Sequence, residues 1–443
     1  MPMSYRDLHR EYLRYVESNK TFFLVSSQEY FSTLETSSAK IQGETIKSYF
    51  HPYILSGDEY GAIERTTNIM AEIIAKVGDL FFRKEEIREA FGFSEELLEL
   101  MHVDPGYDMF LPIGRFDGYF IPEKRLLRFC EFNADGTSGM NETNTMDEAF
   151  LATSLGAGFS QLFSLSNCEL RTTLLDVLLT CCRKFYGNTE KIPQTAIIDF
   201  TDKATTAEFA ALKAVFTAAG VPAEICDIRD LTFKDGRLYF REFQLDLAYR
   251  RVVTGDLLER SDTVVDFLRA YKRKSVCTVG SFRTEVAHSK LIFCILTDDR
   301  YGKFFSPAER KFIATHLPWT RKLTSSDPDL EKVVLHNRHS LVLKPYNSYG
   351  SRGIVVGSIC EQKEWEANLS KVMDSNYLVQ EKLAIPKKEF ITGPNGETEE
   401  LKINTSSFMY GGKLAGFYTR VSPHDVITTS LEGAVLPTLV EDA

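Results

Sequence analysis

One stretch, residues 114–133, constrains the fold more than any other part of the chain. It reads GRFDGYF over 114–120 and LLRFCEFN over 126–133, with the short connection IPEKR between the two halves. Side chains of a β-strand alternate between its faces, so residues two apart point the same way. The stretch therefore predicts two strands joined by a turn, each with polar residues on one face and aromatic residues on the other.

The alternation places Arg115 and Asp117 on one face of the first strand, and Glu131 and Asn133 on one face of the second. The aromatic residues expected to pack behind them are Phe116, Phe129 and Phe132. Carboxylate and amide oxygens suit Mg²⁺, which usually binds one or two carboxylates together with substrate phosphates. An arginine beside such an ion would hold a transferring phosphoryl group. The alternative is a solvent-exposed hairpin face with an ordinary salt bridge, an interaction of small energy.

Length and composition describe an ordinary large globular protein. The 443 residues are enough for two or three lobes, and 43% apolar and 26% charged residues are typical values. The net charge of -10, from 52 basic and 62 acidic residues, argues against a nucleic-acid partner, and no long Lys/Arg run opposes this. A small anionic ligand would then need a local basic pocket.

The cysteines and the apolar runs indicate the compartment. The 8 cysteines have no CxxC spacing, which favours reduced thiols in the cytosol and does not indicate zinc. No stretch approaches the roughly 20 apolar residues needed to cross a bilayer, and residues 1–19 are charged rather than signal-like. We expect a cytoplasmic protein without a membrane partner. The sequence leaves the oligomeric state open.

Residues 1–102 are expected to be mostly helical, because apolar residues recur there at spacings of three and four. The pattern predicts helices over 5–17, 59–77 and 94–101, with Asp58 as the N-cap of the second. We assign this region to packing and no chemistry to it.

A polar loop, NADGTSGMNE over 133–142, follows the second predicted strand. Loops of this kind carry ligand contacts when a rigid strand positions them. Asp135, Thr137 and Ser138 are candidates for contacts with substrate. Turn formation alone would select the same residue types, so both interpretations stay open.

The middle of the chain predicts an α/β lobe. A helix is expected over 170–186, and a strand, a helix and a strand over 195–200, 205–219 and 223–226 form a βαβ unit with a parallel sheet. Asp235-Gly236 predicts a tight hairpin turn.

Three basic residues in and after this lobe allow two interpretations. Arg250 and Arg251 follow a predicted strand and either face an anionic ligand or pair with surface acids. Lys290 lies in a helix expected over 284–296, where a lysine usually extends to solvent.

A second informative stretch covers residues 341–357. An apolar strand ends at Lys344, a Gly/Ser loop follows, and a β-branched strand comes after the loop. Backbone N–H groups of a glycine loop can cradle phosphate oxygens, and Lys344 and Arg352 add positive charge. The stretch is not a Walker loop, because the glycine-lysine-serine/threonine ending before a helix is missing.

The last part of the chain predicts a strand over 377–383, placed to lie beside an adenine, and an alternating hairpin over 401–420. Arg420 and His424 are candidate ligand contacts at the end of this hairpin.

The order of strand, Lys344, glycine loop, strand, helix and a strand ending in Gln380-Glu381 resembles the nucleotide half of an ATP-grasp fold. In most ATP-grasp enzymes the Glu and Asn metal ligands follow that half. Here Glu131 and Asn133 precede it by about 200 residues. This order resembles the circularly permuted ATP-grasp group typified by glutathionylspermidine synthase, and the likeness covers roughly residues 105–440.

The resemblance implies an α/β (α+β) fold: a circularly permuted ATP-grasp core with a pre-ATP-grasp-like α/β lobe and a helical N-terminal region. The implied units are a helical region over 1–102, metal-binding strands over 103–169, the α/β lobe over 170–282, and a nucleotide-binding lobe with a phosphate lid over 283–443.

The resemblance also implies roles for individual residues. Asp117, Glu131 and Asn133 would bind two Mg²⁺ ions, and Arg115 would steady a phosphorylated intermediate. Lys290 and Lys344 would contact the phosphates of ATP. Gln380 and Glu381 would border the adenine and the ribose, and Arg352 would be a mobile lid arginine. The other residues of the expected phosphate-binding tip are Ser348, Gly350, Ser351 and Gly353.

The activity implied is that of an ATP-dependent carboxylate–amine ligase, which forms an amide through an acylphosphate. A kinase on the same fold and a non-catalytic nucleotide-binding protein are the alternatives. The partners would be a small-molecule or peptide carboxylate and an amine; glutathione with spermidine is one pair, and a peptide or amino acid another. The chain departs from the synthetases in three ways: it has Gly136-Thr137 where they have Thr-Pro, it has Ser351 in place of a lid acid, and no cysteine–histidine amidase part precedes the synthetase part.

Overall fold

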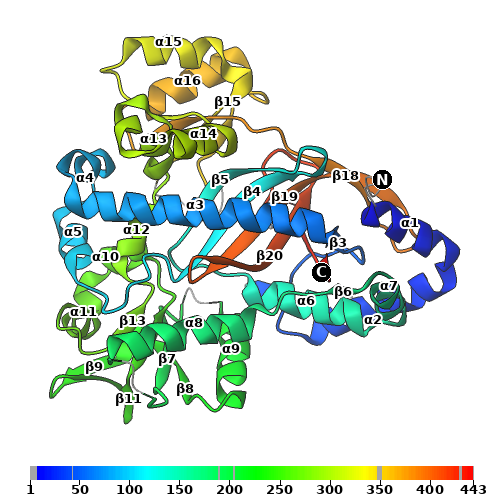
Figure 1. Ribbon diagram of the computed structural model, residues 1–443, viewed down its shortest axis with the longest axis horizontal. Helices are drawn as coiled ribbons and strands as arrows, with labels where there is room; N and C mark the ends of the chain where they lie inside the picture. Colours follow the sequence, from blue (N-terminus) through cyan, green and yellow to red (C-terminus); the bar gives the residue numbers. More distant parts are fainter. Residues whose placement is uncertain are drawn as a thin grey trace.

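The computed structural model describes residues 7–41, 43–187, 190–202, 205–346, 352–428 and 432–442. A long helix, α3, crosses the face of a central sheet, with one α/β unit above it and another below it in Figure 1. Among the described residues, no helix is both long enough and apolar enough to span a membrane.

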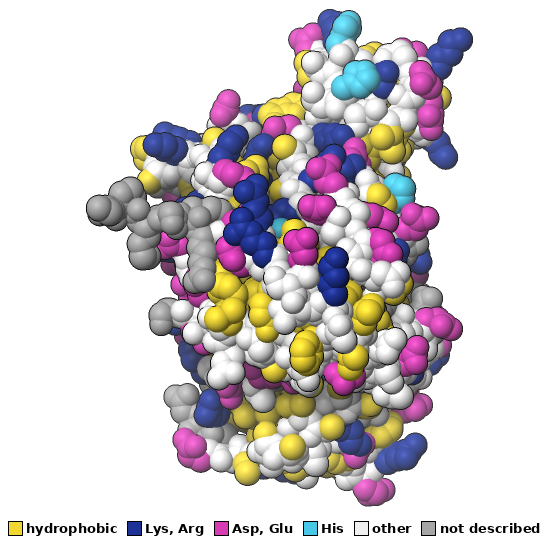
Figure 2. Space-filling model, turned by 90° about the vertical axis from the view of Figure 1, so that its right-hand side faces the viewer, with side chains coloured by type: hydrophobic (Ala, Val, Ile, Leu, Met, Phe, Trp, Pro, Cys, Tyr) yellow, Lys and Arg dark blue, Asp and Glu magenta, His cyan; other side chains and the backbone are white. Residues whose placement is uncertain are grey.

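The N-terminal region is mostly helical, as expected. Its helices are α1 (Leu8–Ser18), α2 (Lys20–Thr36), α3 (Gly57–Arg83), α4 (Glu85–Phe91) and α5 (Glu95–His102). Short strands lie between α2 and α3: β1 (Lys40–Ile41), β2 (Glu44–Thr45) and β3 (Tyr53–Leu55). Hydrophobic side chains gather across the middle of the face drawn in Figure 2, over α2 and α7 (Ser154–Phe163), where Phe22, Val25 and Leu162 are exposed.

The prediction that Asp58 caps α3 is wrong. The N-cap is Ser56, whose hydroxyl accepts from the backbone N–H of Glu59 while the Glu59 carboxylate accepts from the Ser56 N–H. This reciprocal arrangement satisfies two N–H groups that the first helical turn leaves without partners. Asp58 already lies inside the helix, and its side chain binds Arg125 at 2.7 Å.

The central sheet unites strands from distant parts of the chain. Its members are β4 (Ile113–Ile121), β5 (Leu126–Asn133), β18 (Lys387–Ile391), β19 (Thr398–Tyr410), β20 (Lys413–Ser422) and β21 (Ala434–Leu436). The order is β21-β20-β19-β4-β5, with β18 paired to β19 outside this path. Both predicted hairpins, 114–133 and 401–420, are confirmed, and the pairing of β4 with β19 joins them into one surface.

A β-bulge in β5 determines which side chains face the core. Asp117 pairs with Glu131, but the next pair along the ladder is Gly118 with Phe129, so Cys130 is an extra residue in β5. Because of this bulge, Phe129 and Phe132 are both buried although they are three residues apart. The predicted aromatic packing behind the polar face is therefore confirmed, with the Phe116 and Phe132 ring centroids 4.7 Å apart.

The α/β lobe contains the predicted βαβ unit. Four parallel strands, β7 (Thr195–Asp199), β8 (Ala223–Asp227), β12 (Leu247–Arg250) and β13 (Cys277–Val279), lie in the order β13-β12-β7-β8. The helices of the lobe are α8 (Leu170–Phe185), α9 (Thr206–Ala218), α10 (Thr254–Glu259) and α11 (Val265–Lys272). A second, antiparallel sheet holds β9 (Leu231–Lys234), β10 (Arg237–Phe240) and β11 (Phe243–Leu245), and the Asp235-Gly236 turn joins β9 to β10 with φ of 49° and 76°.

Two helices connect β5 to this lobe: α6 (Met140–Ala152) and α7. A small sheet formed by β3, β22 (Thr438–Glu441) and β6 (Leu165–Ser166) brings the last described strand beside the N-terminal region.

The remaining lobe has an antiparallel sheet in the order β14-β17-β15-β16. Its strands are β14 (Thr320–Lys322), β15 (Leu341–Pro345), β16 (Val355–Val356) and β17 (Tyr377–Glu381), so the predicted hairpin over 341–357 and the strand at 377 are confirmed. Its helices are α12 (Glu285–His288), α13 (Leu291–Thr297), α14 (Pro307–His316), α15 (Pro328–His336) and α16 (Gln362–Val372). A separate hydrophobic core around Trp365 stabilises this lobe.

The single helix predicted over 284–296 is two helices, because the chain breaks at Ser289-Lys290 between α12 and α13. Lys290 is only 5% exposed, so the expectation that it extends to solvent is also wrong. The break turns Lys290 toward β5, and the Phe293 ring of α13 stacks on Phe132 at 4.7 Å. The division of the chain into four units stays a prediction.

Candidate functional site

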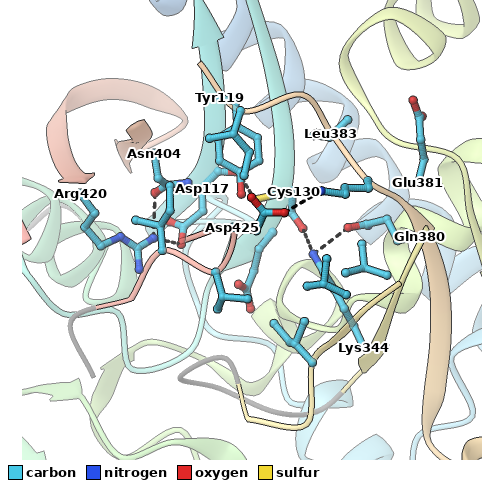
Figure 3. Close-up of a pocket in the computed structure, with 18 residues that line it drawn as sticks. Asp117, Tyr119, Cys130, Lys344, Gln380, Glu381, Leu383, Asn404, Arg420 and Asp425 are labelled. Carbon is cyan, nitrogen blue, oxygen red and sulfur yellow. Dashed lines mark hydrogen bonds and ion pairs between the residues drawn. The ribbon is translucent and has the colours of Figure 1, made fainter. Parts of the chain in front are cut away.

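A pocket lies between the central sheet and the sheet of the β14–β17 lobe (Figure 3). Its polar lining comes from both sheets and from the segment after β20: Asp117, Tyr119, Cys130, Glu131, Lys344, Gln380, Glu381, Lys382, Asn404, Arg420 and Asp425. Its walls are otherwise aliphatic: Val342, Ile354, Val356, Leu383, Ile385, Val426 and Ile427. A polar floor under an apolar cleft suits a ligand with a flat base and a charged tail.

Asp117 lies at the centre of the polar floor and is 4% exposed. Its carboxylate accepts from Arg115 Nε at 2.9 Å and from Arg420 Nη2 at 2.6 Å. Burial raises the pKa of Asp117, but the positive charges of Arg115 and Arg420 outweigh burial and hold that pKa below its usual range. The carboxylate is therefore ionised and neutralised by two guanidinium groups.

Glu131 faces Asp117 across the β4–β5 ladder and has a cation of its own. Lys290 Nζ lies 2.7 Å from the Glu131 carboxylate. Burial and the Asp117 charge raise the pKa of Glu131, whereas Lys290 and Lys344 lower it to a net value below the ordinary one. Two facing carboxylates, each ionised and each balanced by cations, are thus brought together.

Asn133 lies opposite Arg115 at the end of β5. Its Nδ2 is buried and has no hydrogen-bond partner among the described residues. No group of three or more His, Cys, Asp or Glu side chains in the described ranges could hold a metal ion. A Mg²⁺ ion here would bind the two carboxylates and the amide oxygen, and phosphate or water would complete its shell, which fits the habit of that ion.

Lys344 spans the gap between the two sheets. Its ammonium donates to Gln380 Oε1 at 2.8 Å on β17 and to the Cys130 carbonyl at 3.4 Å on β5. Gln380 in turn donates to Thr320 Oγ1 at 3.2 Å. Both predicted nucleotide contacts therefore lie in the pocket, bonded to each other.

Glu381 also lines the pocket, but its carboxylate binds Arg128 of β5, with N···O distances of 3.2 and 3.1 Å. This bidentate pair links the two sheets.

The structure describes only part of the predicted lid. Ser348, Gly350 and Ser351 lie outside the described residues. Arg352 and Gly353 are exposed, and Gly353 has φ +74° with Tyr377 Oη only 2.5 Å from where a Cβ would lie. This position requires glycine for both reasons.

Arg420 belongs to the site, since its Nη2 donates to the Asp117 carboxylate at 2.6 Å and to Asn404 Oδ1 at 2.9 Å. His424 does not reach Asp117; it is exposed and bonds Glu432 at 3.2 Å. The pattern did not single out Asn404 or Asp425. The alternation along 401–420 could have placed Asn404 and Ser406 on the same face of the strand, whereas Asp425 lies in an irregular segment without a sequence signal.

The polar loop after β5 is buried rather than open to a ligand. Asp135 and Thr137 are buried, and the Ser138 carbonyl accepts from Arg115 Nη1 at 2.9 Å. Arg250 pairs with Asp135 and Arg251 with Glu208, so both expectations for the arginines, a ligand or surface acids, are wrong: the partners are buried acids.

Comparisons with known proteins agree with this architecture. Residues 176–380 match the family model described as a circularly permuted ATPgrasp. A solved structure, a glutathione synthetase like-effector (GSS30) from Globodera pallida in apoform, has a TM-score of 0.58 and 12% sequence identity; the match covers 94% of this chain and 97% of that one. No curated protein matches the sequence.

The fold is thus an ATP-grasp fold with its strands in permuted order: the Asp117 and Glu131 strands precede the Lys344 lobe in the chain and complete its pocket in space. Residues 176–380 are similar to the circularly permuted ATP-grasp family, and the structural match extends the likeness in fold over most of the chain.

Proposed function

We propose that the protein is an ATP-dependent carboxylate–amine ligase, similar to glutathionylspermidine synthase, that forms an amide through an acylphosphate. One observation carries the proposal. The ionised pair Asp117 and Glu131 on one sheet faces Lys344 and Gln380 on the other, within a single pocket. Acids for a metal and cations for phosphate at one end of an apolar cleft are what bound Mg-ATP requires.

Asp117, Glu131 and Asn133 would hold Mg²⁺, as two ions in the family's manner. When bound, the metal neutralises phosphate charge and supports in-line transfer. Arg115, Arg420 and Lys290 hold the two carboxylates in the described structure. Because a metal would take over that neutralisation, these cations become available to the transferred phosphoryl group.

The reaction has two steps. A carboxylate oxygen of the acyl donor attacks the γ-phosphorus of ATP, the bond from that phosphorus to the bridging oxygen breaks, and ADP leaves. The amine nitrogen then attacks the acyl carbon, the carbon–oxygen bond to phosphate breaks, and the amine loses a proton to give the amide and inorganic phosphate. Arg115, with Arg352 from the lid, would stabilise the charge on the transferred group.

The nucleotide end follows from the other sheet. Lys344 would contact the phosphates, with Ser348, Gly350, Ser351 and Gly353 of the tip around them. Gln380 and Glu381 would border the adenine and ribose. The aliphatic walls exclude water, which protects an acylphosphate from hydrolysis.

The test is ADP release, measured across panels of carboxylates and amines, with hydroxylamine as a trap for the acylphosphate. The ligase requires both substrates for turnover, forms a hydroxamate with the trap, and loses turnover in Asp117→Ala. Turnover that survives Asp117→Ala would overturn the metal assignment.

Two other results would favour a different function. ADP release that needs a carboxylate or alcohol but no amine, without an amide product, would identify a kinase. Failure to bind Mg-ATP in calorimetry would exclude the ligase and favour a non-catalytic protein.

A further inference from the structure

Arg250 is the last residue of strand β12 in the α/β lobe and Arg251 follows it, at the place where such sheets usually bind ligands. The chain passes from β7 to β8 on one side and from β12 to β13 on the other, so the crevice at the carboxyl ends of β7 and β12 is the topological switch point. Successive strand residues point to opposite faces, so the two arginines point away from each other.

The crevice is filled by the chain itself. The loop over 134–139, which follows the candidate metal strand β5, lies against it: a Cβ at Gly136 would be 2.6 Å from the Arg251 carbonyl oxygen. Asp135 accepts from the Thr254 N–H at 2.6 Å, on the segment that follows β12.

Arg250 holds the first half of this loop. Its Nη2 lies 2.8 Å from Asp135, and the two side chains are 0% and 1% exposed. Arg250 is fixed in turn, since Nη1 donates to the Val252 carbonyl at 2.7 Å and the guanidinium lies 4.6 Å from the Phe282 ring centroid.

Arg251 holds the second half through α9. Its Nη2 lies 2.9 Å from Glu208, and the other oxygen of that carboxylate accepts from the Gly139 N–H at 3.0 Å. Both side chains of this pair are also buried, at 3% and 0% exposure.

Each half of the loop is connected to residues of the candidate site. On the Arg251 side, the Ser138 carbonyl accepts from Arg115, which binds Asp117. On the Arg250 side, the residues before Asp135 are Ala134, whose N–H donates to His288 Nδ1 at 3.5 Å, and Asn133. His288 lies two residues before Lys290, the partner of Glu131.

We propose that Arg250 and Arg251, through Asp135 and Glu208, are positioning residues for the metal and phosphoryl site. The α/β lobe then acts as a rigid support. The loop after β5 occupies the crevice at the carboxyl ends of β7 and β12, where a ligand would otherwise bind, and the two arginines hold it there. The inference rests on the proposed function, because it concerns the same site. It predicts that the metal-dependent part of ATP binding depends on two ion pairs that touch neither metal nor ATP.

The test uses Glu208→Gln and Asp135→Asn in the full chain. Each amide keeps the size of the side chain and an oxygen for the Gly139 or Thr254 N–H, but removes the charge that orients the arginine. Calorimetry measures the Kd for ATP with Mg²⁺ and with EDTA, and ADP release measures kcat. We expect the Kd in EDTA to change less than about twofold, the Kd with Mg²⁺ to rise about tenfold, and kcat to fall about 10- to 100-fold, since small misplacements of a positioned group cost that much.

Asp227→Asn is the matched control. Asp227 ends β8 in the same sheet and binds Arg229 at 2.6 Å, but it does not contact the loop. It should leave both Kd values and kcat at the wild-type level. Arg251→Lys, which keeps the charge but not the guanidinium that reaches Glu208, should give an intermediate loss and serves if Glu208→Gln does not fold.

Wild-type values in Glu208→Gln and Asp135→Asn would overturn the inference while the proposed function stands. An equal loss of Mg-ATP affinity and kcat in Asp227→Asn would also overturn the inference, because a general destabilisation of the lobe would then be the cause. A wild-type protein whose ATP affinity is the same in Mg²⁺ and EDTA would overturn the proposed function and this inference together.

Discussion

Charged side chains in the interior of this protein have oppositely charged partners, which offset the free-energy cost of burying them. The buried carboxylate of Asp117 and the half-buried carboxylate of Glu131 each face a cation, and the buried guanidiniums of Arg250 and Arg251 each face a carboxylate. Burying an unpaired charge is very costly, whereas a paired one is tolerated. At the candidate site, this balance holds two acids ionised and ready for a metal.

Two buried histidines, His9 and His51, avoid the cost of a buried charge because they stay neutral. The Ile391 N–H donates to His51 Nδ1 at 2.9 Å, His51 Nε2 lies 3.3 Å from His9 Nδ1, and His9 Nε2 lies 2.6 Å from the Glu389 carbonyl. One neutral tautomer of each ring satisfies all three contacts. The pair thereby covers backbone groups of β18, which pairs with β19 alone among the described strands.

The histidine pair predicts a pH dependence of stability. Burial, followed by Lys388, lowers the pKa of His9 to about 4, and burial lowers that of His51. The unfolded chain binds protons below its ordinary pKa of about 6.5 and the folded chain does not, so stability is full above that pH and is lost as pH falls toward 4. The free energy of unfolding from urea titrations should fall by about 3 kcal/mol for His9 over this range, and His51 adds a loss of the same sign.

His9→Phe should reduce this slope and leave the part due to His51, because the phenyl ring keeps the packing but does not titrate. His336→Gln, at an exposed histidine of α15, should leave the slope unchanged. A wild-type stability that does not vary between pH 6.5 and 4 would contradict the neutral pair.

At the scale of elements, the ends of helices and the irregularities of strands decide where functional side chains point. The break between α12 and α13 turns Lys290 inward, and the bulge in β5 places Glu131 beside Asp117 while keeping two aromatic rings in the core.

The start of α3 gives a direct test of helix capping. Ser56→Ala removes the capping hydroxyl and should lower the free energy of unfolding by about 1 kcal/mol. Asp58→Ala removes an exposed ion pair and should cost less than about 0.5 kcal/mol. Guanidinium denaturation of both variants measures the difference, and a larger loss in Asp58→Ala would contradict the cap at Ser56.

Deleting Cys130 tests the bulge. Without the extra residue, the ladder is regular and Phe129 and Phe132 still face the core, but the strand twist beside Glu131 changes and the Cys130 carbonyl that accepts from Lys344 is lost. We expect a folded or partly destabilised protein that has lost Mg-ATP binding in calorimetry. Cys130→Ala keeps the residue count and should retain binding. Binding in the deletion variant would show that the bulge does not set the site.

At the scale of the whole molecule, the pocket depends on links between its two sheets. Arg128 with Glu381 is one link. Asp425, in the segment after β20, is another: it binds Lys382 at 2.6 Å and also Lys402, and Lys382 donates to Ser358. These contacts hold the segment with Val426 and Ile427 against the pocket.

Asp425→Asn should weaken the contacts that hold the segment with Val426 and Ile427 against the pocket. We expect the KM for ATP to rise about tenfold, or about 1.4 kcal/mol in binding, with kcat changed less than about threefold, because Asp425 does not contact the Asp117 carboxylate. Steady-state ADP release measures both constants. Asp58→Asn, in an exposed pair with Arg125, is the control and should match the wild type. A fall in kcat at unchanged KM would contradict a role in holding the nucleotide.

What the sequence by itself determined about this protein is local. Alternation along 114–133 predicted the two strands, with Arg115 and Asp117 on one face of the first and Glu131 and Asn133 on one face of the second. The spacing over 195–226 predicted the parallel sheet, because such patterns follow from the geometry of one element. Only the tertiary structure decided the partners: Arg420 on Asp117, Lys290 on Glu131 and Glu208 on Arg251 are brought together across 43 to 303 residues of sequence. A charged side chain in a sequence is compatible with solvent, a ligand or a buried partner, and the choice among them depends on desolvation and packing that no local pattern contains.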